Sequence, residues 1–278
     1  MKKVVSIAVF GDADRYAQYL SAFVRAHLNL FPISDGWRLC VHIDDNVAKC
    51  RHGEFIRRLG AAGLVDAEQM GSAALTKAML WRMKPVFSDA DYVFCRDLDA
   101  CPMPRDRAVC DQFIVSQATV HTVHDNLAHA GIMGGLCGFR VAAFQRETGL
   151  RALDDLYRFA NIGDDIWRLH GTDQNVLNRL ICRPGGPIVL EHRFAGWTNG
   201  SPTGYRRSPG IYDGQQAYSA PTPDVGVSKL QGELARKADR LAAHMGAAGY
   251  DHLAAQQFYD EHGDPAVAEA VRVCEAPK

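Results

Sequence analysis

The chain has 278 residues, which exceeds the usual size of a single domain and suits one large α/β domain with an appendage. Its hydrophobic fraction of 47% and charged fraction of 23% are those of a folded globular protein and exclude a largely disordered chain. The formal net charge of −1 provides no general attraction to nucleic acid or to anionic membrane, so neither is expected as the main partner.

The cysteines and the N-terminal residues indicate a compartment. Eight cysteines are spread over the chain without a Cys-x-x-Cys pair, which predicts buried thiols in a reducing compartment and neither a zinc site nor a disulfide scaffold. The first apolar run, residues 4–10, contains Ser6 and stops at Gly11, which favours a strand over a signal peptide. No stretch approaches the roughly 18 apolar residues of a membrane-spanning helix. We therefore expect a cytoplasmic protein without a transmembrane segment.

The N-terminal part of the chain alternates between the apolar repeat of strands and that of helices. The expected strands are residues 4–10, 37–43, 64–70 and 92–95, and the expected helices are residues 16–30, 47–60 and 73–83. We expect Pro85 to stop the last of these helices. This alternation indicates a right-handed parallel α/β sheet, which binds ligands at the carboxyl ends of its strands.

The middle of the chain is expected to complete the sheet. The expected elements are a strand at 112–124, helices near 150–160 and from 172, and a strand at 187–190. A glycine-rich stretch over residues 130–140 is not a P-loop, because no Gly-Lys-Ser/Thr closes it. Its glycines allow a ligand or another chain to approach the backbone closely.

The C-terminal part has a different composition. Residues 195–224 are rich in glycine and proline, which predicts a lid or binding loop with little regular structure. From residue 227 the apolar residues recur at helical spacing. We therefore expect an α/β domain over residues 1–224 and a helical extension over residues 225–278. The extension is expected to bind the acceptor or a second copy of the chain, or else to pack on the core domain.

An acidic pair follows the strand at 92–95. Asp97 and Asp99 are two positions apart on an extended segment and therefore project the same way. Two adjacent carboxylates stay ionised together when a cation lies between them, and a hard divalent ion with oxygen ligands is the simplest such cation. The alternative is a pair of turn or helix-capping aspartates.

Six segments in order over residues 4–195 resemble the metal-dependent glycosyltransferases of the GT-A fold, and more narrowly a group of bacterial and viral predicted glycosyltransferases. The matching segments are Phe10-Gly11-Asp12 with Tyr16, Gly36-Trp37 with Asp44, Trp81-Arg82, Arg96-Asp97-Leu98-Asp99, His124 and His129 with Ile132-Met133-Gly134-Gly135, and Asp173-Gln174 with Leu177. The resemblance implies a GT-A-like parallel or mixed sheet flanked by helices. It also implies transfer of a sugar, expected to be a hexose, from a nucleotide-sugar to an acceptor such as a surface glycan.

The resemblance also implies roles for individual residues. The metal, Mn²⁺ or Mg²⁺, is expected on Asp97, Asp99 and His192. The nucleotide-sugar is expected on Phe10, Gly11, Asp12, Tyr16, Asp44, Arg82, Lys84 and Asp97. Asp173 and Gln174 are the expected catalytic residues, and the acceptor is expected near His124, His129, Gly134 and Gly135. Whether the transfer retains or inverts the sugar's configuration stays open.

Several alternatives stay open beside this interpretation. Asp173 could simply cap a helix, Tyr16 could belong to the core, and His124 and His129 could be ordinary loop histidines. A sugar-1-phosphate nucleotidyltransferase would need a basic glycine-rich loop after the first strand. This chain instead has an acidic turn there, Gly11-Asp12-Ala13-Asp14. A non-catalytic nucleotide- or sugar-binding module with the same fold would differ by failing to hydrolyse a nucleotide-sugar with metal. A homo-oligomer is compatible with each of these functions.

Overall fold

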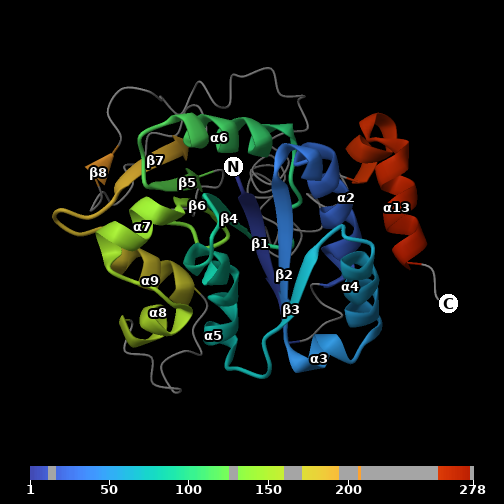
Figure 1. The fold of residues 1–278 in the computed structure, drawn as a ribbon, viewed down its shortest axis with the longest axis horizontal. Coiled ribbons are helices and arrows are strands. Elements are labelled where there is room, and N and C mark those ends of the chain that lie inside the picture. The colour runs from blue at the N-terminus through green and yellow to red at the C-terminus, as the bar shows by residue number, and fades with distance from the viewer. Residues whose placement is uncertain (12–16, 125–130, 160–170, 194–205, 208–255, 276–278) are drawn as a thin grey trace, which may run out of the picture.

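The structure is a computed structural model, and it describes residues 1–11, 17–124, 131–159, 171–193, 206–207 and 256–275. In these residues an eight-stranded sheet has the order β3-β2-β1-β4-β6-β5-β7-β8 (Figure 1). The strands are β1 Lys3–Val9, β2 Trp37–Ile43, β3 Asp66–Gln69, β4 Tyr92–Arg96, β5 Val120–His124, β6 Leu136–Arg140, β7 Ile188–Arg193 and β8 Arg206–Arg207. The predicted class, an α/β sheet flanked by helices, is confirmed.

The sheet is mixed because one strand runs against its neighbours. β1, β2, β3 and β4 pair in parallel, as do β5, β7 and β8, whereas β6 is antiparallel to both β4 and β5. β6 comes from the glycine-rich stretch, for which no strand is predicted from the sequence. Its direction brings the residues before Leu136 to the edge where β4 ends.

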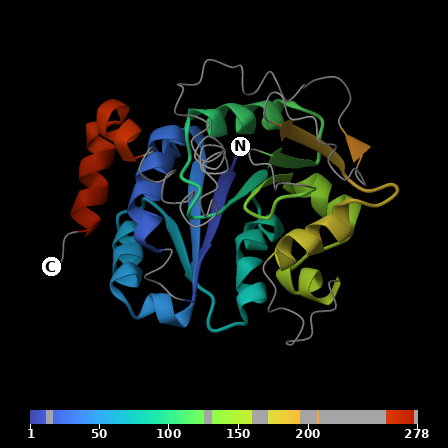
Figure 2. The same ribbon diagram turned by 180° about the vertical axis from the view of Figure 1, so that it is seen from behind.

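Helices cover both faces of the sheet, as Figures 1 and 2 show. On one face lie η1 Ala17–Tyr19, α2 Leu20–Leu30, α4 Arg51–Ala61, α6 Pro104–Val115 and α13 Pro265–Glu275. On the other face lie α5 Leu75–Met79, η3 Trp81–Phe87, α7 Val141–Thr148, α8 Leu153–Phe159 and α9 Thr172–Ile181. Two short helices, η2 Ile33–Asp35 and α3 Asp45–Ala48, flank β2. None of these helices in the described ranges is long and apolar enough to cross a membrane.

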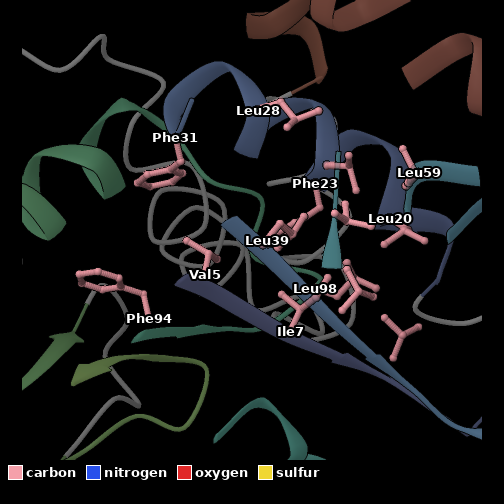
Figure 3. Close-up of a cluster of buried hydrophobic side chains, with 14 of the residues drawn as sticks. Val5, Ile7, Leu20, Phe23, Leu28, Phe31, Leu39, Leu59, Phe94 and Leu98 are labelled. Carbon is pink, nitrogen blue, oxygen red and sulfur yellow. The ribbon is translucent and has the colours of Figure 1, made fainter. Parts of the chain in front are cut away.

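Alternation along the strands divides the core into two clusters. Val5 and Ile7 of β1 pack with Phe23 of α2 in the first cluster (Figure 3), whereas Val4 belongs to the second cluster with Val93 of β4. Successive side chains of a strand point to opposite faces, so a strand that is buried on both faces is apolar throughout. This explains why the run of residues 4–10 shows no alternation.

One predicted strand and one predicted helix end are wrong. Residues 112–124 are not one strand, since α6 continues to Val115 before β5 begins at Val120. Pro104 at the start of α6 and the bond from Met103 N–H to Asp106 begin this helix upstream of the predicted strand. Pro85 also fails to stop the helix before it, because η3 runs through it as a 3₁₀ helix. A proline removes only its own N–H donor, and the Pro85 carbonyl still accepts from Ser88 N–H at 3.1 Å.

The C-terminal residues that the structure describes pack on the core domain. α13 lies beside α2 and α4 (Figure 2). Its Val271 and Cys274 are buried in the first cluster. The predicted apolar helix after residue 227 lies outside the described residues, as does most of the predicted lid. Arg206 and Arg207, within that predicted lid, form β8 beside β7. None of the eight cysteines, all of them in described ranges, forms a disulfide.

Candidate functional site

The predicted nucleotide side begins where β1 and β2 end. Asp44 caps α3 through its Oδ1, which accepts from Val47 N–H at 2.8 Å, while its Oδ2 accepts from Gly11 N–H at 2.9 Å. Both carboxylate oxygens therefore bind backbone N–H groups, and Asp44 is 8% exposed. Its role in the structure is to hold the turn after β1 against the start of α3. Any contact of Asp44 with a ribose would add to this capping role.

An aromatic contact joins the same turn to η3. The ring of Phe10 lies edge-on to Trp81, with ring centroids 6.0 Å apart. Gly11 has φ +78°, a conformation that favours glycine. Asp12 and Tyr16 lie outside the described residues.

Arg82 connects two carboxylates at the end of β4. Its Nη1 donates to Asp97, its Nη2 donates to Asp173 Oδ2 at 3.0 Å, and its Nε donates to the Met79 carbonyl at 2.9 Å. Arg82 and Asp173 are buried, whereas the side chain of Asp97 is 44% exposed. A guanidinium can form such a fork because its donors lie in one plane. Segments 91 positions apart in the chain thus meet through one side chain.

Two glycines permit this arrangement. A Cβ at Gly135 would overlap the Asp97 carboxylate, and a Cβ at Gly134 would overlap that of Asp173. Neither glycine has a positive φ, so the requirement is space and not backbone conformation. The backbone contributes as well, since Asp97 N–H donates to the Gly135 carbonyl at 3.1 Å. The glycine-rich stretch is therefore the wall against which both carboxylates lie.

Asp173 stands in the first turn of α9, and its environment favours proton uptake. Burial raises the pKa of Asp173, while Arg82 opposes this shift and Asp97 adds to it. The neighbouring Gln174 lies 3.3 Å from the Met133 sulfur through its Nε2. Asp173 and Gln174 thus both face the residues that precede β6.

Asn178 was not singled out from the sequence, yet it fastens α9 to the glycine-rich stretch. Its Oδ1 accepts from Ile132 N–H at 2.9 Å, and a Cβ at Gly131 would overlap its side chain. The available signal was its spacing, because residues 174 and 178 share one face of a helix.

Lys84 lies away from the two carboxylates. Its Nζ forms an ion pair with Glu68 of β3 and lies 3.9 Å from the Met70 sulfur. His42, whose Nδ1 lies 3.5 Å from Glu68 Oε2, lowers the pKa of Glu68 to about 2, and Lys84 adds to this effect. The structure therefore places Lys84 with β3.

His124 is a buried partner of two groups near the glycine-rich stretch. Its Nδ1 is 2.8 Å from Glu191 Oε1, and its Nε2 is 2.6 Å from the Gly131 carbonyl. His124 is 1% exposed and is hydrogen-bonded to the backbone at the start of the described glycine-rich stretch. His129 lies outside the described residues.

His192 lies inside β7, and not after the strand as predicted. Its Nε2 is 3.2 Å from Gln112 Oε1 of α6, and its ring lies edge-on to His121 at 4.5 Å. Burial lowers the pKa of His192 well below its usual value. α6 covers one face of the sheet, whereas Arg82, the ion-pair partner of Asp97, lies on η3 at the other face. The structure therefore does not bring His192 to the acidic pair.

Asp97 and Asp99 have the chemistry that a divalent cation requires. Both are partly exposed at the end of β4, and carboxylate oxygens are the ligands of Mg²⁺ and are suited to Mn²⁺. Arg82 pairs with both Asp97 and Asp173, so one guanidinium charge is shared between two carboxylates, which favours a further cation nearby. In the described part of the chain no group of three or more His, Cys, Asp or Glu side chains forms a complete metal site. Further ligands would come from a bound diphosphate or water.

Comparisons with known proteins give distant structural likenesses. No family model and no curated protein sequence matches the chain. The glycosyltransferase GlyE of Streptococcus pneumoniae TIGR4 is similar with 16% identity and a TM-score of 0.43 over 65% of this chain, and the match spans 43% of GlyE. TarS 1–349 of S. aureus is similar with 12% identity and a TM-score of 0.45 over 97% of this chain and 77% of that one.

A third similar structure is the mannosyltransferase PcManGT of Pyrobaculum calidifontis in complex with GDP-Man and Mn²⁺. Its identity is 12% and its TM-score 0.44, over 98% of this chain and 79% of that one. Likenesses this distant leave the activity to be argued from the residues of this chain.

Proposed function

We propose that the chain is a glycosyltransferase that moves a sugar from a nucleotide-sugar to an acceptor with the help of a divalent cation. The observation that carries the proposal is the arrangement of Asp97, Arg82 and Asp173 against Gly134 and Gly135. It lies at the carboxyl end of β4, the edge at which α/β sheets bind ligands. The two adjacent glycines let both carboxylates lie directly against the backbone at this edge.

On the donor side, Asp97 and Asp99 would hold Mn²⁺ or Mg²⁺. When bound, this ion would neutralise the charge that develops on the departing nucleoside diphosphate. The turn held by Asp44 and Gly11 would line the nucleotide, and Asp12 and Tyr16 stay predicted contacts of the same ligand. Lys84 would reach the diphosphate only after leaving Glu68.

On the reacting side, Arg82 would orient Asp173, and Gln174 would lie beside it. In an inverting reaction the Asp173 carboxylate would accept the proton of the acceptor hydroxyl, and burial would favour this because it raises the pKa of the carboxyl group. In a retaining reaction the same carboxylate would stabilise the oxocarbenium-like sugar. A hexose as the transferred sugar, a surface glycan as acceptor, a homo-oligomer and a cytoplasmic location stay predictions from the sequence.

The proposal can be tested by incubating the protein with a panel of nucleotide-sugars, Mn²⁺ and mixed glycan acceptors, and measuring the nucleoside diphosphate released. We expect release from one donor, loss of release with EDTA, and at least a hundredfold slower release by Asp173→Asn, in line with the usual contribution of a general base. Asp111→Asn is the matched control, because Asp111 is a half-exposed aspartate on α6 paired with Arg107. Release of pyrophosphate from a nucleoside triphosphate and a sugar phosphate would instead indicate a nucleotidyltransferase.

A further inference from the structure

The C-terminal residues reach the loop that follows the acidic pair. Tyr259 is 3% exposed, and its hydroxyl donates to the carbonyl of Pro102 at 2.9 Å. The two residues are 157 positions apart in the chain. Pro102 lies three residues after Asp99, in the segment that connects β4 to α6.

This connecting loop can form few hydrogen bonds of its own. Its beginning is fixed by Asp97 N–H, which donates to Gly135, and by Ala100 N–H, which donates to the Asp97 carbonyl at 3.2 Å. Further along, Pro102 and Pro104 have no N–H to donate. The far end of the loop is held by Met103 N–H, which donates to Asp106 Oδ2 at 2.8 Å, by its side chains and by the Pro102 carbonyl.

The side chains of the loop enter a small apolar cluster that Tyr259 completes. Cys101 and Met103 are buried there beside Tyr259 and Ala26 of α2. The Cys101 sulfur also lies 3.5 Å from the Ala22 carbonyl. The loop is thus packed between α2 and the C-terminal segment.

Tyr259 itself stands on a fixed support. Arg25 of α2 donates to the Tyr259 carbonyl and forms an ion pair with Asp260. A few residues later, Asp264 N–H donates to Asn29 Oδ1 at 2.6 Å. α13 then packs on α2 and α4. The residues from Tyr259 to α13 are therefore held against α2 along their length.

We propose that Tyr259 is a positioning residue for the acidic pair: its hydroxyl and ring hold residues 100–103, and thereby Asp99, in place. This inference rests on the proposed function, because it assigns Asp99 a ligand role. A loop that is already ordered has less conformational entropy to lose when a cation and nucleotide bind. Without the Tyr259 hydroxyl, residues 100–103 would lose more conformational entropy when the cation and nucleotide bind, and the affinity would fall.

The test compares Tyr259→Phe with Tyr92→Phe. Tyr92 is a matched control because it is 7% exposed and its hydroxyl donates to the Ile114 carbonyl at 3.1 Å, at the other end of β4. Binding of UDP and of GDP with MnCl₂ is measured by calorimetry, and hydrogen exchange of the amides of residues 98–101 is followed by mass spectrometry. We expect Tyr259→Phe to weaken Mn²⁺-dependent binding about fivefold, the factor that corresponds to a hydrogen bond of about 1 kcal/mol, and to speed exchange in the loop. Tyr92→Phe is expected to change neither.

The two readouts separate the possible failures. If the wild-type protein binds neither nucleotide with Mn²⁺, the proposed function fails, and the hydrogen exchange still decides whether Tyr259 orders the loop. If the wild-type protein binds a nucleotide and Tyr259→Phe matches the wild type in affinity and exchange, the positioning role is refuted. Equal effects of both substitutions on affinity would also refute it, since they would reflect general stability.

Discussion

At the level of single residues, Arg82 joins the two carboxylates of the site. It faces Asp97 and Asp173 together, and it is almost wholly buried with Asp173. A buried carboxylate that loses its partner keeps the cost of desolvation without the compensating attraction. The stability of this region therefore depends on the guanidinium being present.

Replacing Arg82 tests this dependence. We expect Arg82→Met to lower the free energy of unfolding by about 3 kcal/mol at neutral pH, because it leaves Asp173 buried and uncompensated. The double variant Arg82→Met/Asp173→Asn should recover a large part of the loss. Urea unfolding of the wild type and of the three variants forms a double-mutant cycle. A double variant that is as unstable as the sum of the single variants would show that the two side chains are not coupled.

Gly135 leaves the space that the Asp97 carboxylate occupies. Gly135→Ala should displace the Asp97 carboxylate, lower the free energy of unfolding by about 1–3 kcal/mol, and weaken binding of Mn²⁺. Gly60→Ala is the control, because a Cβ there would meet its nearest atom, Ala67 Cβ, only at 3.8 Å. Since Gly60 lies within α4, its replacement should be neutral or slightly stabilising. Titration of Mn²⁺ into both variants measures the metal affinity, and thermal unfolding measures the stability. Equal Mn²⁺ affinities of the two variants would contradict the prediction.

At the scale of elements, α2 contains a buried titratable group. His27 is fully buried beside Phe31, and burial lowers its pKa to about 3. The unfolded chain takes up a proton on His27 near pH 6.5, whereas the folded protein does so only near pH 3. Stability therefore falls as the pH is lowered through this range, by up to about 1.4 kcal/mol per pH unit for one such group. The buried His121 and His192 act in the same direction.

Replacement of His27 should flatten this acid dependence. We expect His27→Leu to lose less stability than the wild type between pH 6.5 and pH 3, because one proton-binding group of the unfolded chain is gone. His262→Leu, at an exposed position, should keep the slope of the wild type. Urea unfolding at several pH values gives both slopes. An unchanged slope in His27→Leu would mean that His27 takes up its proton in the folded state as readily as in the unfolded chain.

α13 allows a comparison within one helix. Val271 is 2% exposed and packs on the core, whereas Val273 is 58% exposed. Val271→Ala should lower the free energy of unfolding of the whole α/β domain by about 1–3 kcal/mol, and Val273→Ala by less than about 0.5 kcal/mol. Chemical unfolding followed by tryptophan fluorescence checks this, because the tryptophans lie outside α13. Equal, small effects would mean that α13 does not belong to the cooperative core.

Elements with a strong local signal could be predicted from the sequence, whereas elements whose position depends on tertiary contacts could not. β1, β2 and β4 are apolar runs bounded by turns, and their parallel pairing follows from the helices between them. Gly134 and Gly135, just before β6, leave room for Asp173 and Asp97, and this requirement appears only once the three segments are adjacent. The position of His192 depends on the pleat and register of β7, and a shift of one residue would turn its side chain to the other face.

At the scale of the whole molecule, the candidate site is assembled from distant segments. The turn after β1, the start of α3, η3, the end of β4, the glycine-rich stretch and the start of α9 each contribute one or two groups. Tyr259 of the C-terminal segment bonds to Pro102 in the loop that follows the acidic pair. That polar residues gather at the carboxyl edge of the sheet could be predicted from the sequence. The bond between Arg82 and Asp173 could not be predicted, because no sequence pattern links residues 91 positions apart.

We propose that this edge of the sheet binds a nucleoside diphosphate through a divalent cation on Asp97 and Asp99. Calorimetric titration of UDP and GDP into the wild type, Asp99→Asn and Asp89→Asn, each with Mn²⁺ and with EDTA, tests it most directly. Asp89 is the matched control, because it is an exposed aspartate paired with Lys2. We expect Mn²⁺-dependent binding of one nucleotide to the wild type and to Asp89→Asn, and loss of the Mn²⁺-dependent part in Asp99→Asn. Binding that is unchanged by EDTA, or equal in Asp99→Asn and the wild type, would contradict the account.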